Sequence, residues 1–385
     1  MYLDHAATAF PRPDCVLDSV LTWLRRGGSP GRGGHAAALQ ATSLLLHTRS
    51  ALAQFLNAPG PESILFTAGC TASLNTVLLG LLQPGDHVVA SELDHNSVLR
   101  PLQHLKTSRR ITVQHLPFDP RSGLLNPDDL QHSLRHTPAK LVVLSHASNV
   151  TGRVQDIPAL THVAHQHGAL VLLDAAQTVG HWPCAFNTLH ADFIAAAAHK
   201  GLAGPPGIGF LACSPRHQQL LQPLLFGGTG TDSSSLDQPA DSPARFESGT
   251  ANLPAVAGLL AAVQLAQNTL HERHAATLRN SVLLVSGLAE IPGLRLLSPS
   301  PPHPLCGIVS FVIDGLDPAE AAAILDQAFD IQCRAGLHCA PLAHQRLGTL
   351  HSGGTIRLST GWSTTEAEIA LAIDAVRQIA RSLHK

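Results

Sequence analysis

Residues 169–177 form the sequence ALVLLDAAQ, an apolar run that Asp174 closes. A run that is apolar from end to end is typical of a strand covered on both faces, as in a mainly parallel sheet. An open α/β sheet binds its ligand beyond the carboxyl ends of its strands. The segment therefore predicts an α/β fold, and it makes the polar residues that close each strand the first candidates for a binding site.

Similar runs recur between about residues 60 and 215, each followed by a turn and an amphipathic helical stretch. We expect strands in SILFTAG, DHVVASE, ITVQHL, KLVVLSHAS, ALVLLDAAQ, DFIAAAAHK and GIGFLAC. This alternation predicts a mainly parallel, seven-stranded central sheet with helices on both faces.

A second block follows a loop rich in Gly, Ser and Pro that begins at Phe226. A long helical pattern starts near Leu253, and GIVSFVIDGL and a capped helix in DPAEAAAILDQA lie beyond it. The closer mixture of strands and helices predicts a smaller α+β domain. We assign residues 14–262 to a large domain, and residues 1–13 and 263–385 to the small one.

The composition indicates a globular protein that acts on a small molecule. Of the 385 residues, 44% are hydrophobic and 14% are charged, with a formal net charge of −2. The basic residues are scattered, which argues against a nucleic-acid partner. We see no signal core and no run that approaches a membrane span, so we expect a cytoplasmic protein without a membrane partner. The seven cysteines lack regular spacing, which favours free thiols.

Lys200 stands at the end of the predicted strand DFIAAAAHK, among small residues. A lysine that is partly desolvated at a strand end has a lowered pKa, which favours the free amine needed for a Schiff base. A strand-end lysine that simply reaches solvent is the equally weighted alternative on this fragment alone.

The other strand ends favour the Schiff-base interpretation. Asp174 is placed to keep the pyridine nitrogen of pyridoxal phosphate (PLP) protonated, which makes the ring an electron sink. Gln177 follows within reach of the phenolic oxygen of the ring. Asn149 closes another strand, and His95 follows a third, where an imidazole can stack on the ring. Each is ordinary alone, but together on one sheet edge they indicate a PLP site.

A phosphate site is predicted in ILFTAGCTASLN, where a strand, a tight turn and a helix follow one another. Cys70 and Thr71 then lie at a helix N-terminus, whose free amides and dipole suit a dianion. Residues 334–344, RAGLHCAPLAH, place Cys339 between two histidines. This cysteine is a metal ligand, a buried small residue or a nucleophile.

Taken together, these motifs resemble those of the class V group of PLP enzymes, and most closely the cysteine desulfurases and selenocysteine lyases with an Arg-x-Gly-x-His-Cys motif. The resemblance spans nearly the whole chain in register. It is carried by YLDHAAT (2–8), PGRGGH (30–35), LDHNSVLRPL (93–102), SNVTG (148–152), DAAQ (174–177), HKGLAGPPGIG (199–209), GGTGTDS (227–233), FESGTANL (246–253), RAGLHCAPLAH (334–344) and IRLSTG (356–361).

The resemblance implies the type I PLP transferase fold and a role for each cofactor-binding residue. Lys200 would bind PLP covalently, and His199 with the Cys70-Thr71 turn would hold its phosphate. His95 would stack on the ring, and Asp174 and Gln177 would tune it. Thr250 would reach the phosphate of a neighbouring subunit, which implies a homodimer with shared active sites.

The same resemblance implies the chemistry. The catalytic residues would be Lys200, His95 and Cys339, which lies in the small domain. Lys200 would move the α proton of L-cysteine, and the thiolate of Cys339 would take the sulfur as a persulfide, leaving L-alanine. Arg357 would bind the substrate carboxylate, with Asn149 and Arg334 beside the substrate.

We expect positive charge from His338 and Arg334 to favour the thiolate. The persulfide would pass to an acceptor thiol or a sulfur-carrier protein. One departure from the relatives is Ala197, which stands where they often carry a hydroxyl that binds the phosphate.

Three alternatives remain. In the first, the chain is a selenocysteine lyase or another class V aminotransferase or lyase that does not use Cys339. In the second, it is a non-catalytic protein with the same fold. In the third, His338, Cys339 and His344 bind a metal, but no second ligand pair stands at zinc spacing, so we predict no metal site.

Overall fold

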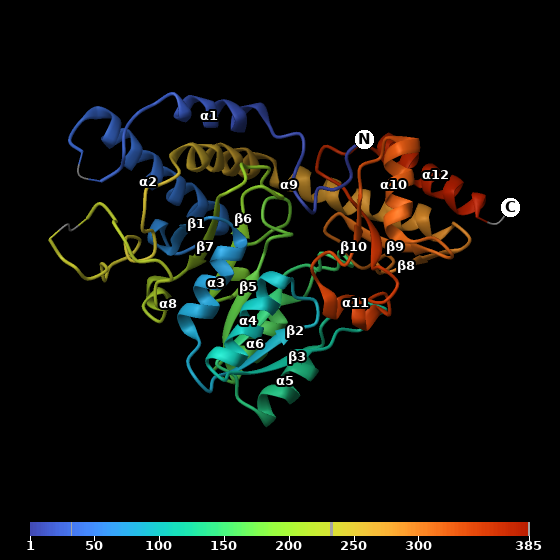
Figure 1. Ribbon diagram of the computed structural model, residues 1–385, viewed down its shortest axis with the longest axis horizontal. Coiled ribbons are helices and arrows are strands. Elements are labelled where there is room, and N and C mark those ends of the chain that lie inside the picture. Colours follow the sequence, from blue (N-terminus) through green and yellow to red (C-terminus); the bar gives the residue numbers. More distant parts are fainter. Residues whose placement is uncertain (32, 232–233, 384–385) are drawn as a thin grey trace.

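The structure is a computed structural model that describes residues 1–31, 33–231 and 234–383 (Figure 1). Arg32, Asp232 and Ser233, which belong to two of the motifs above, lie outside the described residues.

The strands form two sheets, and all seven predicted strands of the first are present. The first contains β1 (Ile64–Thr67), β2 (His87–Ser91), β3 (Thr112–Leu116), β4 (Leu141–Ser145), β5 (Leu170–Asp174), β6 (Phe193–Ala197) and β7 (Gly209–Cys213). The second contains β8 (Leu294–Leu296), β9 (Ile308–Ile313), β10 (Arg334–Gly336) and β11 (Thr355–Ser359).

The helices surround both sheets. They are α1 (Asp14–Leu24), α2 (Ala36–Leu56), α3 (Cys70–Leu81), α4 (Asn96–Ser108), α5 (Pro127–His136), α6 (Ile157–Gln166), α7 (Phe186–Leu189), α8 (Pro215–Gln218), α9 (Leu253–Ala289), α10 (Pro318–Phe329), α11 (Pro341–Leu347) and α12 (Glu366–Ser382), with a short 3₁₀ helix at Pro61–Ser63. The cap predicted for α10 is confirmed, since the Asp317 side chain accepts a hydrogen bond from the Ala319 amide.

The large sheet has the strand order β1-β7-β6-β5-β4-β2-β3. Only β7 runs antiparallel to its neighbours, β1 and β6, and the other adjacent strands are parallel. The predicted fold class is therefore confirmed. Because the parallel strands share one direction, the residues that close β2, β4, β5 and β6 meet at one edge.

Helices cover both faces of this sheet, as the apolar strands require. On β4, Val142 and Leu144 pack into a core with α2, α5, α6 and α9, whereas Leu141 and Val143 pack on the opposite face with α3 and α4. Successive residues of a strand point to opposite faces, so an uninterrupted apolar strand needs two cores. Figure 1 shows these two helical layers around the sheet.

The small sheet has the order β10-β11-β9-β8 and is antiparallel throughout. Its core includes residues of α9, α10 and α12, and also Leu3 from the N-terminus. The Leu3 amide donates to the Gln332 carbonyl, and the Ser359 amide donates to the Leu3 carbonyl. The first residues of the chain therefore lie beside its last strand. The exact domain boundaries stay a prediction, because α9 continues through them.

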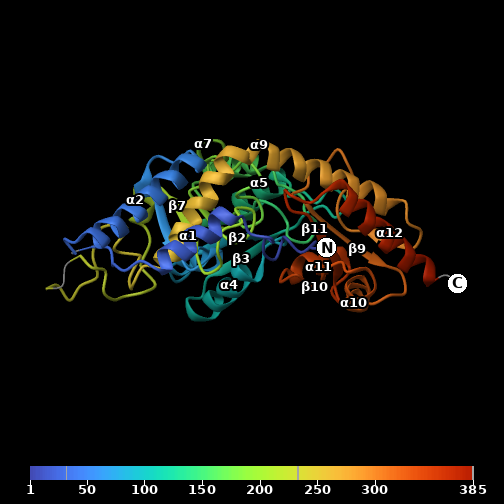
Figure 2. The ribbon, with the colours of Figure 1, turned by 90° about the horizontal axis from the view of Figure 1, so that it is seen from above.

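Helix α9 corrects one expectation from the sequence. It is 37 residues long, and its apolar stretch is long enough to cross a membrane by length and composition. Half of that stretch is buried inside the protein. The helix runs along the molecule from the large sheet to the small one, with α1 and α2 packed beside its first part (Figure 2). Packing in the core accounts for its apolar character.

Candidate active site

The carboxyl-terminal edge of the large sheet opens into a cavity of about 1540 Å³. The wall of this cavity contains eight residues predicted to contact the cofactor of the same chain: Cys70, Thr71, His95, Asn149, Asp174, Gln177, His199 and Lys200. Thr250, predicted to reach the cofactor of a neighbouring subunit, also lines this cavity. They come from separate segments that the parallel strands bring to one edge. The structure thus places the predicted set together, while the role of each residue stays a prediction.

Lys200 lies in the turn that follows β6, with its backbone carbonyl accepting a hydrogen bond from the Ala203 amide at 2.7 Å. Burial lowers the pKa of Lys200 below its usual value, and the nearby Asp174 carboxylate opposes that shift. The site therefore favours the free amine more than solvent does, which is the form that attacks a carbonyl carbon.

The Asp174 carboxylate is held in place by two donors. The Cys70 thiol donates to Oδ1 at 3.4 Å, and the Ala176 amide donates to the same oxygen at 3.0 Å. Burial raises the pKa of Cys70 well above its usual value, so this thiol stays protonated and serves as a donor. The carboxylate is thus fixed in orientation at the cavity wall.

Helix α3 begins at the same wall. Its N-cap is Gly69, with a φ of 147° and no side chain to cap the first amides. Any residue with a Cβ would be strained at this φ. The first amides of a helix have no partner within the helix, so this uncapped terminus presents free donors to the cavity. Ala197 also lines the cavity and adds no hydroxyl there.

His95 and His199 are both neutral in this environment. Burial lowers the pKa of His95, and burial with the Lys200 charge lowers the pKa of His199 to about 4. The Ser97 amide donates to Nδ1 of His95 at 3.0 Å, which leaves the proton of the neutral ring on Nε2. His199 Nδ1 lies 3.2 Å from the hydroxyl of Thr8. His199 thus offers a ligand a hydrogen bond rather than a charge.

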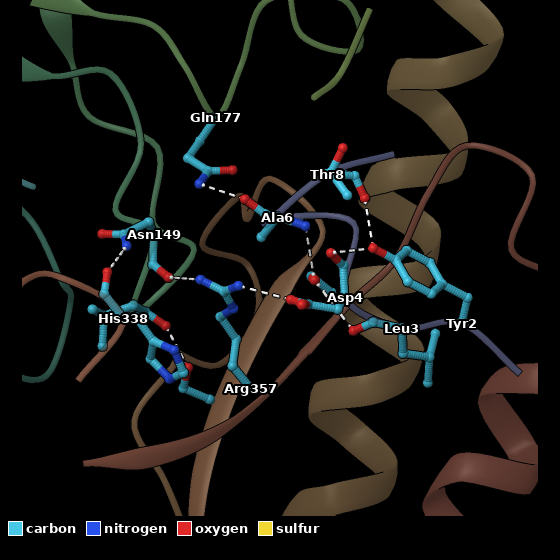
Figure 3. A network of polar contacts seen from close by, with 12 residues as sticks. Tyr2, Leu3, Asp4, Ala6, Thr8, Asn149, Gln177, His338 and Arg357 are labelled. Atoms are coloured by element: carbon cyan, nitrogen blue, oxygen red, sulfur yellow. Dashed lines mark hydrogen bonds and ion pairs between the residues drawn. The ribbon is translucent and has the colours of Figure 1, made fainter. Parts of the chain in front are cut away.

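The predicted substrate residue Arg357 is linked to this wall without lining the cavity. Its Nη1 donates to the Asn149 carbonyl at 3.1 Å, and its Nη2 pairs with the Asp4 carboxylate at 2.9 Å. Figure 3 shows the guanidinium held between these two residues. Arg357 is 2% exposed, and its Nε is buried with no hydrogen-bond partner within the described residues. An unsatisfied buried donor beside the site suits an incoming carboxylate.

Gln177 also bonds toward the N-terminal segment, since its Nε2 donates to the Ala6 carbonyl at 3.1 Å (Figure 3). The sequence-based prediction placed this side chain at the phenolic oxygen of the cofactor. In the structure, its amide group is oriented by the same N-terminal segment that carries Asp4.

Cys339 lies in a tight turn between β10 and α11. The Ala340 amide donates to the Leu337 carbonyl at 2.9 Å, which closes the turn. The two central residues, His338 and Cys339, have φ of 47° and 59°. Positive φ at both central positions is the pattern of a type I′ turn, which Asn and Gly favour. For other residues this conformation costs about 1–3 kcal/mol each, so surrounding contacts must maintain it.

The predicted electrostatic role of His338 is wrong. Its ring is buried, with Nε2 3.0 Å from the Thr355 hydroxyl. Burial, together with the charge of Arg357, lowers the pKa of His338 to about 2, so the imidazole carries no charge. Of the two predicted sources of positive charge near Cys339, only Arg334 remains.

His344 has a structural explanation that the sequence did not suggest. It is fully buried in α11, with Nδ1 2.8 Å from the Thr349 hydroxyl. Burial lowers the pKa of His344 to about 4, while the Leu337 carbonyl beside it opposes the shift. His344 is therefore a neutral, buried side chain whose hydrogen bond to Thr349 joins α11 to the segment that follows it. Within the described residues, no group of three His, Cys, Asp or Glu side chains is arranged to bind a metal.

Two residues near Cys339 and Arg357 were not singled out from the sequence. Asp4 was quoted only within a motif, and its role as partner of Arg357 required the fold. Asn96 acts through its backbone amide, which donates to the Cys339 carbonyl at 2.7 Å. Since every residue except proline carries such an amide, no sequence signal could have identified this contact.

The comparisons with known proteins agree with this geometry. The family model described as Aminotransferase class-V matches residues 1–371. The chain belongs to this family. A class-V relative from Methanothermobacter thermautotrophicus, named a probable cysteine desulfurase, is 34% identical over 99% of this chain and 94% of its own length.

Solved structures of the same fold give the same result. The apo structure of a cysteine desulfurase from Thermococcus onnurineus has a TM-score of 0.92 and 31% identity, covering 99% of this chain and 95% of its own. The cystine C-S lyase C-DES, solved with its product cysteine persulfide, has a TM-score of 0.84 and 27% identity, covering 98% and 97%. The predicted class V membership and fold are therefore confirmed.

Proposed function

We propose that the protein is a cysteine desulfurase that converts L-cysteine to L-alanine and receives the sulfur on Cys339 as a persulfide. The observation that carries the proposal is the attachment of the Cys339 turn to Asn96 and Asn149. These residues follow β2 and β4, at the same edge of the sheet that presents His95, Asp174 and Lys200 to the cavity. The names of the relatives support the same activity.

The cofactor that this site fits is PLP. Lys200 would hold it covalently, the uncapped α3 terminus at Cys70 and Thr71 would bind its phosphate with His199, and Asp174 would face its ring nitrogen. A C-DES structure with glycine linked covalently to its PLP cofactor, 26% identical with a TM-score of 0.82, supports this assignment. When bound, PLP supplies an electron sink for the substrate carbons.

Each of these residues then has its own role in the reaction. The Nε edge of Arg357 would bind the substrate carboxylate, with Arg334 and Asn149 beside it, and neutral His95 would stack on the ring of the cofactor. Lys200 Nζ, released when the substrate amine takes its place, would take the proton from the substrate α-carbon. The thiolate of Cys339 forms an S–S bond with the substrate sulfur as the C–S bond breaks. The electron pair of the C–S bond stays with the β-carbon, which takes up a proton, and Lys200 Nζ returns a proton to the α-carbon to give alanine.

A homodimer with shared active sites is part of the proposal. Thr250 lines the cavity and is exposed, so a second copy of the chain could contact it. Exposed apolar side chains lie on α1, α2 and the loop after α8: Leu17, Leu21, Leu24, Leu39, Leu46, Leu225 and Phe226. Such side chains suit an interface between copies of the chain.

We further propose a cytoplasmic location, a sulfur-acceptor protein as partner, and a large cofactor-binding domain at residues 14–262. The small domain, residues 1–13 and 263–385, then carries the Cys339 turn. The core of the small sheet supports this division, whereas Ala340, Ala343 and Leu347, which follow the Cys339 turn, pack into the core of the large sheet.

The test is incubation of the PLP-loaded protein with L-cysteine, followed by intact mass measurement. We expect one added sulfur on the wild type and on Cys15→Ser, which changes an exposed cysteine, and none on Cys339→Ser. Sulfide release by Cys339→Ala that equals the wild type would instead favour a C-S lyase that does not use this cysteine. Activity retained only with selenocysteine would favour a selenocysteine lyase.

A further inference from the structure

We propose that Asn149 and the backbone amide of Asn96 are positioning groups that hold the Cys339 turn in its strained form. The inference rests on the proposed function, because it explains how the nucleophile is kept in place. Asn149 then positions the turn in addition to any contact with cofactor or substrate. Asn96 positions the turn through its backbone amide, not through its side chain.

The two donors form hydrogen bonds with consecutive carbonyl groups of the turn. Asn149 Nδ2 donates to the His338 carbonyl at 2.6 Å, and the Asn96 amide donates to the Cys339 carbonyl at 2.7 Å. His338 and Cys339 are the two central residues of the turn, and both have positive φ. The contacts therefore fix the orientation of both peptide groups at the strained positions, from outside the turn.

Both donors are rigidly placed. Asn149 is buried in the segment after β4, where its backbone carbonyl accepts from Arg357 (Figure 3). Asn96 is the first residue of α4, and His95 before it caps the helix and lines the cavity. The turn is thus tied to two strand ends that also form the cofactor wall. Asn149 in addition links the turn to the arginine that is proposed to bind the substrate.

Loss of either donor should leave the turn free to relax from its positive φ values. The Sγ of Cys339 would then spend less time where it can attack the substrate sulfur. A displacement of about 1 Å in a reacting group can lower a rate about 100-fold, which sets the expected scale.

The sharpest variant is Asn96→Pro, compared with Asn96→Ala. Both remove the Asn96 side chain, but only proline removes the amide that bonds to Cys339. Proline is favoured at the first position of a helix. His95 already has φ of −72° and ψ of 159°, which is the conformation that a residue before proline adopts. The pair therefore isolates one hydrogen bond.

Two measurements compare these variants. The first is the rate at which Cys339 gains sulfur in a single turnover, measured by quenching and intact mass, with PLP binding checked by visible absorbance. The second is hydrogen exchange of the Ala340 amide, which closes the turn and requires no activity. We expect Asn96→Pro to gain sulfur about 100-fold more slowly than Asn96→Ala, with equal PLP binding and at least about tenfold faster exchange.

Equal sulfur-transfer rates and equal exchange in the two variants would overturn the proposal. If Asn96→Pro does not fold, exchange in Asn149→Ala decides the matter: exchange faster than in the wild type supports the proposal, and unchanged exchange overturns it. A wild type that gains no sulfur would refute the proposed function alone, because the exchange comparison still tests the positioning contacts.

Discussion

Arg334 and Arg357 lie directly opposite one another on the antiparallel strands β10 and β11. Residues paired in this way project from the same face of the sheet. Burial lowers the pKa of Arg357; the Asp4 carboxylate opposes the shift, while the charge of Arg334 adds to it. Asp4 therefore neutralises Arg357, one of two like charges that face each other. The other, Arg334, begins the segment that leads to Cys339.

Replacement of Asp4 by asparagine should destabilise the protein by about 3 kcal/mol, because it leaves the charge of Arg357 buried without a counterion. Urea denaturation measures this loss. The matched control is Asp330→Asn, since the Asp330 side chain is 91% exposed and its one ion pair within the described residues is with the N-terminus. A loss for Asp4→Asn no larger than that of the control would show that the ion pair does not stabilise the fold.

Replacement of Arg357 by lysine should raise KM for L-cysteine about 10- to 100-fold, because lysine keeps the charge but cannot bind a carboxylate through a planar fork. Steady-state kinetics measures the change. Arg346→Lys is the control for the same substitution, since Arg346 forms a surface pair with Glu92. An unchanged KM in Arg357→Lys would place the substrate carboxylate elsewhere.

Replacement of Gly354 by alanine should disturb the segment that leads to Cys339. Gly354 has a φ of 93°, and an added Cβ would lie 2.2 Å from the Gly336 oxygen and 2.9 Å from the Leu337 nitrogen. Backbone must move to relieve this contact, so we expect a loss of more than about 3 kcal/mol and slower sulfur transfer.

Gly315→Ala is the control for Gly354→Ala. Gly315 has a similar φ of 78°, but nothing lies within 4 Å of its added Cβ. This variant should lose only about 1 kcal/mol, from the unfavourable φ. Equal losses in the two variants, measured by urea denaturation, would attribute the whole effect to φ and none to the contact with the segment before Cys339.

Asp94 should make the stability fall as pH rises from about 4 to about 7. Burial raises the pKa of this carboxyl from its usual value near 3.8 to about 7, against hydrogen bonds from the Ser91 amide and the Ser145 hydroxyl. Between these values the folded state holds a proton that the unfolded state has released. Raising the pH therefore favours unfolding, by about 4 kcal/mol over the whole interval.

Asp94→Asn tests this prediction, because the asparagine oxygen can accept from the Ser91 amide, its Nδ2 can donate to the Ser145 hydroxyl, and its side chain does not titrate. Urea denaturation across the same pH range measures the unfolding free energy of both proteins. As pH rises, the unfolding free energy of the wild type should fall relative to that of the variant. A difference that stays constant would show that Asp94 keeps its usual pKa in the folded protein.

Much of the candidate site was predictable because it depends on local pattern. Apolar runs identified the strands, and the polar residues that follow them, such as Asp174 and Lys200, were then bound to meet at one edge of a parallel sheet. The charge of His338 was not predictable in this way. Its imidazole is neutral because the surrounding side chains exclude water, and burial is a property of the packed molecule.

The sequence by itself determined the seven strands and the polar residues that close them, because both follow from the periodicity of side chains along the chain, while the resemblance to class V enzymes added His199 and Thr250. Only the tertiary structure decided what holds Arg357 and Cys339. Asp4 and Arg357 are 353 positions apart in the sequence, and the bond from Asn96 to Cys339 joins backbone groups that every segment shares. Such contacts exist only when packing brings distant segments together, and they orient the groups on which the proposed chemistry depends.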